Sequence, residues 1–336
     1  MKDIKFLDCT LRDGAHVVSG SFGQKRILDI IGKLSTAHVD MIEFGFLKMC
    51  SYEPDKIYYP RIENAYALLD QAECSQEAIY ALMARADEYD IRKLTDSNGR
   101  ISLIRVAFYY DFLDGGIEFA KQAMDKGYLC SLNLINTPGA TLEELKVFAD
   151  RANEIRPFAV SLVDTFGMLN LAELQQIIKM YDARLDKSIR IGLHVHENLS
   201  LTFALAQRFL AITEEERKVI VDGSLMGIGR SPGNLCSELI ASYLNDNYGK
   251  KINIHKIMDA VSKDIKPLKK DFSWGYSPEF FLSAICRVHR SYAEYLEKRG
   301  ISLENIRVLL GKIDLEHKGK YNRDYIRELA EKEGLL

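Results

Sequence analysis

Short apolar runs rich in β-branched and aromatic residues alternate with longer amphipathic stretches from the N-terminus to about residue 247. Eight of these runs have the length and composition of strands. They are Ile4–Cys9, Met41–Phe46, Ala78–Ala84, Ile101–Tyr109, Tyr128–Leu134, Phe158–Asp164, Ile189–His196 and Lys218–Leu225. Six intervening stretches have apolar positions at helical spacing, namely Gln24–Ser35, Gly116–Lys126, Leu142–Ile155, Leu171–Leu185, Leu201–Ile212 and Leu235–Asn247. The hydrophobic pattern therefore predicts repeated strand–helix units.

The repetition of these units predicts the fold class. Repeated strand–helix units favour a parallel sheet, and eight of them match a closed (β/α)8 TIM barrel. The alternative is a doubly wound open sheet, which more often has about five or six strands. The third unit is the hardest to divide, because Ala78–Ala84 is also compatible with a helix. We expect an α/β fold of the TIM-barrel class.

The pattern changes after about residue 250, where only helices are predicted. These are Ile252–Lys263, Pro278–Lys298, Leu303–Leu310 and Arg323–Lys332. We therefore expect a catalytic barrel over residues 1–250 and a helical C-terminal extension over residues 251–336.

Composition narrows the class of function. The chain has 336 residues, of which 47% are hydrophobic, and its formal net charge is −3. Nucleic-acid binding would require a basic excess, so the expected substrate is a small molecule. The six cysteines form no C-x-x-C pair and no apolar run has the length of a membrane span, which indicates a reduced, cytoplasmic protein without membrane contact.

The chemistry of a barrel lies where its strands end, and the first predicted strand runs into a polar segment, Asp8–His16. This segment holds Arg12, Asp13 and His16 within five residues. One interpretation is a solvated loop in which Arg12 and Asp13 simply pair. The other is a site at the mouth of the barrel.

The seventh predicted strand ends in a His-x-His pair. His194 and His196 project from the same face because side chains alternate along a strand. Two imidazoles on one inward face can chelate a cation, although a hydrogen-bonded pair of core histidines is the alternative. Asp13 is the candidate third ligand, since two histidines and one carboxylate form a frequent metal site. In a closed barrel only the eighth strand separates the first strand from the seventh.

The eighth predicted strand runs into a glycine-rich loop with Gly227, Gly229 and Gly233. This spacing differs from the dinucleotide-binding G-x-G-x-x-G pattern. The loop either presents backbone amides to the site or is a structural turn.

Three motifs together resemble a known family. They are Leu7–Gly14, Leu193–Asn198 and Gly227-x-Gly229-x3-Gly233-Asn234. They occur in the order and on the strands expected of the HMG-CoA lyase-like superfamily, the DRE-TIM metallolyases. The resemblance covers roughly residues 1–250, and the Arg12-Asp13-Gly14-x-His16 spacing is most similar to the 4-hydroxy-2-oxovalerate aldolases.

This resemblance implies a role for each matching residue. Arg12 would stabilise a pyruvate enolate, Asp13 and the two histidines would bind the metal, and His16 would take the proton of the substrate's 4-hydroxyl. The remaining substrate-binding positions are Thr165, Glu43 and Asn234, with an internal salt bridge as the alternative for Glu43. In the extension, Gly275-Tyr276-Ser277-Pro278 resembles a segment that carries a catalytic tyrosine, so Tyr276 is its candidate.

The implied activity is divalent-metal-dependent cleavage of a 4-hydroxy-2-oxo acid to pyruvate and an aldehyde, or the reverse condensation. Mn is the favoured metal, and Mg, Co and Zn also suit these ligands. An acyl-CoA lyase or synthase of the same superfamily is the alternative activity, and a non-catalytic binding protein is the other. The resemblance also implies an acylating aldehyde dehydrogenase as a candidate partner, and a homo-oligomer is a further expectation. The segment Phe46–Asp55 departs from the Gly/His/Ser-rich loop of these aldolases, so we expect the aldehyde half to differ.

Overall fold

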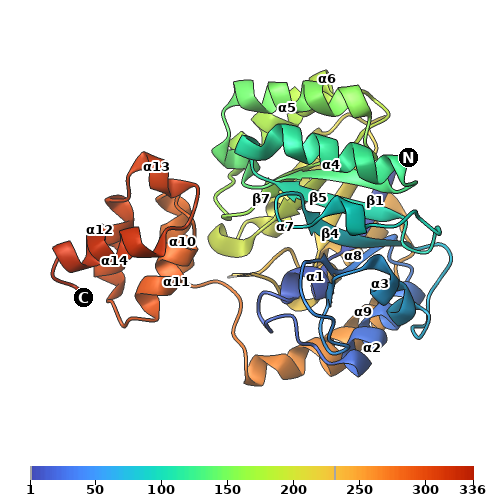
Figure 1. The fold of residues 1–336 in the computed structure, drawn as a ribbon, viewed down its shortest axis with the longest axis horizontal. Helices are drawn as coiled ribbons and strands as arrows, with labels where there is room; N and C mark the ends of the chain where they lie inside the picture. Colours follow the sequence, from blue (N-terminus) through green and yellow to red (C-terminus); the bar gives the residue numbers. More distant parts are fainter. Residues whose placement is uncertain (1, 231) are drawn as a thin grey trace.

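Eight parallel strands close into a barrel in the computed structural model, which describes residues 2–230 and 232–336 (Figure 1). The barrel strands are β1 (Ile4–Asp8), β2 (Met41–Leu47), β4 (Ile79–Arg85), β5 (Leu103–Phe108), β6 (Leu129–Leu134), β7 (Ala159–Asp164), β8 (Arg190–Val195) and β9 (Val219–Gly223). Each strand pairs with its neighbour in the order β1-β9-β8-β7-β6-β5-β4-β2, and pairing of β2 with β1 closes the ring. A short strand, β3 (Tyr58–Tyr59), adds to β2. The predicted TIM barrel is confirmed, and its third unit contains a strand.

Helices on the outside of the barrel follow the strands. They are α2 (Gln24–Thr36), α3 (Ile62–Leu69), α4 (Leu113–Asp125), α5 (Leu142–Ile155), α6 (Leu171–Arg184), α7 (Thr202–Ile212) and α8 (Ser237–Tyr248), whereas the short α1 (Thr10–Gly14) is buried at the end of β1. The start of α5 is fixed by a capping box in which Thr141 accepts from the Glu144 amide and the Glu144 side chain accepts from the Thr141 amide. The apolar faces of these helices form one core with the outer faces of the strands.

The chain after α8 contributes to two hydrophobic cores. Helix α9 (Ile254–Ala260) packs beside α2, and Ile257 and Trp274 belong to the barrel's core. The helices α10 (Pro278–Ile285), α11 (Ser291–Glu297), α12 (Leu303–Gly311) and α14 (Arg323–Lys332) form the second core, and the short α13 (Leu315–Lys318) lies between the last two. Figure 1 shows this red group beside the barrel, connected to it by an extended segment. The expected domain division at residue 250 stays a prediction.

The single helix expected over Pro278–Lys298 is wrong, because the chain breaks between α10 and α11. The Val288 amide donates to Ser283 O at 3.0 Å and the Arg287 amide donates to Ala284 O at 3.0 Å, which is a Schellman motif. Arg287 takes the left-handed position with φ of 55°. Its guanidinium also donates to Glu173 Oε1 at 2.8 Å and Pro138 O at 2.9 Å on the barrel. These contacts direct the following residues, His289 and Arg290, toward the barrel mouth.

The C-terminal helices dock on the loops that follow the barrel strands. Asn198 Nδ2 donates to Phe280 O at 3.0 Å, and Arg290 donates to the backbone oxygen of Thr165. A small apolar cluster of Phe166, Met168 and Ala284 lies at the same contact. The extension therefore covers one side of the barrel mouth.

No helix among the described residues is both long enough and apolar enough to cross a membrane.

Candidate metal centre and pocket

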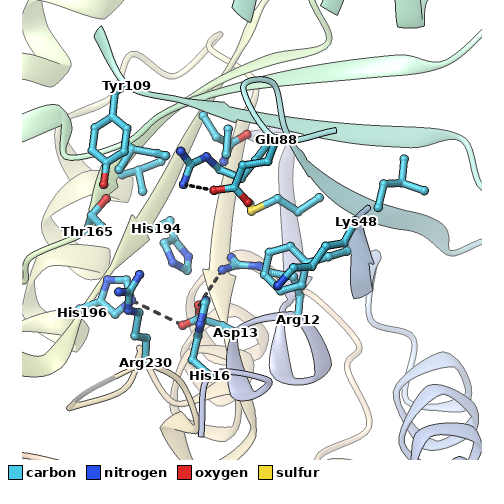
Figure 2. A pocket seen from close by; sticks show the side chains of 18 of the residues that line it. Arg12, Asp13, His16, Lys48, Glu88, Tyr109, Thr165, His194, His196 and Arg230 are labelled. Carbon is cyan, nitrogen blue, oxygen red and sulfur yellow. Dashed lines mark hydrogen bonds and ion pairs between the residues drawn. The ribbon is translucent and has the colours of Figure 1, made fainter. Parts of the chain in front are cut away.

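The helix that follows β1 and the carboxyl end of β8 bring together a carboxylate and two imidazoles. Asp13 lies on α1 directly after β1, while His194 on β8 and His196 just beyond it point to the barrel interior. One potential ligand atom from each residue lies within 4.8 Å of the others, and all three side chains are buried. Figure 2 shows them around a common space. Carboxylate oxygen and imidazole nitrogen are suitable ligands for a divalent metal, so this donor set fits a metal site.

Hydrogen bonds behind the histidines orient their rings. His196 Nδ1 lies 2.9 Å from the backbone oxygen of Asp164, which can only accept, so Nδ1 carries the proton and the lone pair of Nε2 faces Asp13 at 3.5 Å. His194 Nδ1 lies 3.1 Å from the Asp222 carboxylate on β9. Partners of this kind fix the tautomer and orientation of a metal-binding histidine.

A chain of buried charges connects this triad to the barrel interior. Arg12 Nη1 donates to Asp13 Oδ1 at 2.6 Å, and Arg12 Nε donates to Glu43 Oε2 at 2.7 Å. Arg105 on β5 then joins Glu43, at 2.9 Å, to Asp222, at 2.5 Å. Arg12 Nη2 is buried without a hydrogen-bond partner among the described residues. The network holds Arg12, which lines the cavity, in place and leaves its Nη2 amino group without a partner among the described residues.

The same network keeps the candidate ligands in the forms that bind metal. Burial opposes ionisation of Asp13, but Arg12 and the two histidines outweigh it and hold the pKa of Asp13 well below its usual range. Burial lowers the pKa of His194. A charged carboxylate and a neutral imidazole are the ligand forms that a metal requires.

The triad forms one wall of a cavity of about 420 Å³ that also contains Arg12 and His16. The side chain of His16 is 35% exposed, and its Nε2 lies 4.0 Å from Asp13 Oδ1. Burial by the pocket walls lowers the pKa of His16, and the positive charges of Arg230, Arg290 and Arg12 lower it further, against the influence of Asp13. His16 is therefore neutral near pH 7 and can accept a proton from a ligand in the cavity.

Comparison with known proteins identifies the family of this chain. Residues 3–263 match the family model described as HMGL-like. The chain belongs to the HMGL-like family. It is 26% identical over 275 residues to 4-hydroxy-2-oxovalerate aldolase 5 of Rhodococcus opacus (strain B4), a match that covers 79% of this chain and 75% of the relative. A 4-hydroxy-2-oxovalerate aldolase of Geobacillus thermodenitrificans (strain NG80-2) is 24% identical over 330 residues, which cover 93% and 91% of the two chains.

A solved structure has a similar fold. The N-terminal domain of a candidate aldolase from Bacteroides vulgatus matches with a TM-score of 0.75 and 21% identity, over 90% of this chain and 98% of that one. The superfamily inferred from the three sequence motifs is thus confirmed, and with it the assignment of the chain to a family of lyases.

The remaining candidate residues of this HMGL-like protein differ in whether they line the cavity. Thr165 lines the cavity, and its Oγ1 accepts from the Asn136 amide at 2.7 Å. Asn234 Nδ2 donates to Asp13 Oδ2 at 2.5 Å, so Asn234 contacts a candidate metal ligand. Glu43 is 1% exposed and contacts two arginines rather than the cavity. Tyr276 is 55% exposed and does not belong to the described lining of the cavity.

Several residues around the site were missed from the sequence. Arg105 and Asp222 interrupt apolar strands, so strand alternation could have identified them as inward-facing charges. Arg230, His289 and Arg290 also line the cavity. Nothing in the sequence signalled His289 and Arg290, because the pattern around them predicted an uninterrupted helix.

Proposed function

We propose that this protein is a divalent-metal-dependent aldolase that cleaves a 4-hydroxy-2-oxo acid to pyruvate and an aldehyde, or catalyses the reverse condensation. The observation that carries the proposal is the unpartnered Nη2 of Arg12, which lies at a pocket shared with the Asp13, His194 and His196 triad and with His16. The named relatives, which are 4-hydroxy-2-oxovalerate aldolases, support the same class of substrate.

The triad would hold the metal beside the 2-oxo acid. A divalent cation bound there would supply Lewis-acid polarisation of the 2-oxo group. Arg12 donates its free N–H to the keto oxygen, where negative charge develops as the enolate forms. Because Glu43 and Asp13 hold the guanidinium in place, this donor needs no reorganisation during the reaction, as in an oxyanion hole.

His16 provides the proton transfer that breaks the carbon–carbon bond. It removes the proton from the 4-hydroxyl, and the C4–O bond becomes the carbonyl of the aldehyde. The electron pair of the C3–C4 bond passes to C3 and forms the enolate, which becomes pyruvate when C3 takes up a proton. Burial lowers the pKa of His16, so the imidazole is neutral near pH 7 and has a free lone pair for this proton, and it is a weaker base than an exposed histidine.

Hydrogen–deuterium exchange into pyruvate tests the enolate step without knowledge of the aldehyde. Metal-stripped protein is incubated with pyruvate in D2O, with and without added Mn or Mg, and deuterium in the methyl group is followed by mass spectrometry. We expect exchange that depends on the metal and is lost in Arg12→Ala. Exchange no faster than the uncatalysed rate would exclude pyruvate enolate chemistry and direct attention to acyl-CoA substrates.

A further inference from the structure

The lining of the cavity contains more cationic than anionic side chains. Its cations are Arg12, Lys48, Arg85, Arg230 and Arg290, and its carboxylates are Asp13 and Glu88. Arg12 is neutralised by Asp13 and Glu43. Arg85 is neutralised by Asp87, at 2.6 Å, and by Glu88, at 3.4 Å. Positive charge therefore remains on Lys48, Arg230 and Arg290, beyond that of any bound metal.

Arg290 is the most unusual of these cations because it is almost completely buried, at 1% exposure. Its Nη1 donates to the backbone oxygen of Thr165, and its Nε has no partner. In residues 2–230 and 232–336 neither Arg290 nor Arg230 makes an ion pair with a carboxylate within 4.0 Å. Buried charges in proteins are normally paired, since desolvation of an unpaired charge is costly. A ligand with negative charge would provide the missing partner.

Local structure supports a built site at Arg290. The break between α10 and α11 requires Arg287 in the left-handed conformation, which costs about 1 kcal/mol for a residue other than glycine. Such strain is commonly found at functional sites. The break places His289 and Arg290 on the cavity wall, whereas a continuous helix would not turn here.

Arg230 lies on the side of the cavity that holds His16, and Arg290 lines the same cavity. Figure 2 shows Arg230 beside His196 and close to His16, while Glu88 lies across the cavity. In the proposed reaction His16 contacts the 4-hydroxyl, so the groups around it face the aldehyde half of the substrate.

We propose that Arg230 and Arg290 bind a second anionic group, a carboxylate or a phosphate, on the aldehyde half of the substrate. This inference rests on the proposed aldolase function and narrows its substrates to acids with two anionic groups, one at each end. Arginine suits both anions because its planar N–H groups match two oxygens at once. The cavity of about 420 Å³ is of the size that holds drug-sized ligands, so it has room beyond pyruvate.

The test compares aldehydes in the condensation direction with the metal-loaded protein. Pyruvate is combined with butanal and its carboxylate counterpart succinic semialdehyde, and with glycolaldehyde and its counterpart glycolaldehyde phosphate. We expect kcat/KM to be about 10- to 100-fold higher for the favoured anionic aldehyde than for its neutral counterpart, the range that a charged hydrogen bond provides. The pair with the larger ratio distinguishes carboxylate from phosphate.

Variants assign the effect to the arginines. Arg230→Gln and Arg290→Met are each expected to remove most of the anionic preference, with a loss at least tenfold larger than any loss of pyruvate exchange in D2O. Arg327→Gln on the exposed surface of α14 is the matched control and is expected to behave like the wild type. Arg230→Gln decides the question if the buried Arg290→Met variant does not fold.

Four results would overturn the inference. Equal rates with charged and neutral aldehydes would contradict a second anion site, and so would a preference for the anionic aldehyde that survives in both variants. Pyruvate exchange in the same protein would still support the proposed aldolase function. A variant that raises the KM of pyruvate as strongly as that of the aldehyde would assign the arginines to the pyruvate carboxylate instead. Absence of pyruvate exchange in the wild type would overturn the aldolase function and the inference together.

Discussion

Asp13 and His16 lie one helical turn apart but face different environments. Asp13 is 2% exposed and contacts Arg12, His196 and Asn234, as a metal ligand should. His16 borders the open cavity, and its ring packs edge-on against Phe46. The same short segment therefore supplies one group for binding the metal and another for moving a proton.

This difference predicts opposite effects of two substitutions. Asp13→Asn is expected to weaken metal binding more than about tenfold, because the metal loses its only anionic ligand in the triad. His16→Ala should retain metal affinity and lose most aldol cleavage, as removal of a general base commonly costs about 10²- to 10⁴-fold. Metal titration by calorimetry and turnover assays measure both. Loss of metal in His16→Ala would make His16 a ligand instead.

Glu43 offers a prediction about the buried charge network. Its carboxylate accepts from both Arg12 and Arg105, so Glu43→Gln leaves two buried cations with less compensation. We expect a loss of about 3–5 kcal/mol in the free energy of unfolding, typical of a broken buried ion pair, and slower pyruvate exchange. Glu154→Gln removes an exposed pair with Arg151 and should cost at most about 1 kcal/mol. Equal effects in urea titrations would argue against the network.

At the scale of elements, the carboxyl end of β1 is tied to the start of α8. Asp8 accepts from the Ser237 hydroxyl at 2.5 Å and from the Thr10 amide at 2.9 Å. Burial nevertheless raises the pKa of Asp8 from 3.8 to about 6, because these hydrogen bonds do not offset the loss of water. The charged form of Asp8 is thus a source of instability that the fold tolerates.

The raised pKa predicts how Asp8→Asn changes stability with pH. Between about pH 4 and 6 the folded protein binds the Asp8 proton more tightly than the unfolded chain does, so the wild type loses stability as the pH rises. Asn has no proton to lose. Relative to the wild type, Asp8→Asn should gain up to about 3 kcal/mol between pH 4 and pH 7, since each unit of pKa shift corresponds to about 1.4 kcal/mol.

Urea unfolding of metal-free protein at several pH values measures this gain. Asp186→Asn is a suitable control, because hydrogen bonds from Ser188 lower the pKa of the exposed Asp186 and its substitution should shift stability slightly in the other direction. A difference between Asp8→Asn and wild type that does not change with pH would contradict the assignment.

The sequence predicted the elements whose pattern is strictly periodic. The eight barrel strands appear within two residues of their expected ends, because each has an apolar outward face that packs against the helical layer. The triad was predictable because strand alternation fixes His194 and His196 on one face. The break at Arg287 was not predictable, since a left-handed arginine is held there by tertiary contacts with Glu173 and Pro138. Because the sequence pattern did not predict this break, Tyr276 rather than Arg290 was predicted as the residue of the extension at the site.

At the scale of the molecule, metal binding and folding should be linked. The three candidate ligands come from segments that are far apart in the sequence and meet only in the closed barrel. A metal that binds this arrangement and not the unfolded chain stabilises the fold, by about 2.7 kcal/mol at a metal concentration one hundred times its Kd.

Chemical denaturation before and after chelation tests this linkage. Added Mn should restore the denaturation midpoint of the chelated wild type. Asp13→Asn should need about tenfold more Mn for the same rise in its midpoint. A midpoint that is indifferent to chelator and metal would argue against the triad as a metal site.

The position of Arg290 late in the chain has a consequence for how the site is assembled during synthesis. The ribosome releases the barrel, including His194, His196 and Asn234, before the segment that carries Arg290. Because Arg290 follows α10, which contacts Asn198 on the barrel, a nascent chain can complete its metal ligands before Arg290 has been synthesised. The proposed anion site is therefore completed by a later part of the chain than the candidate metal site.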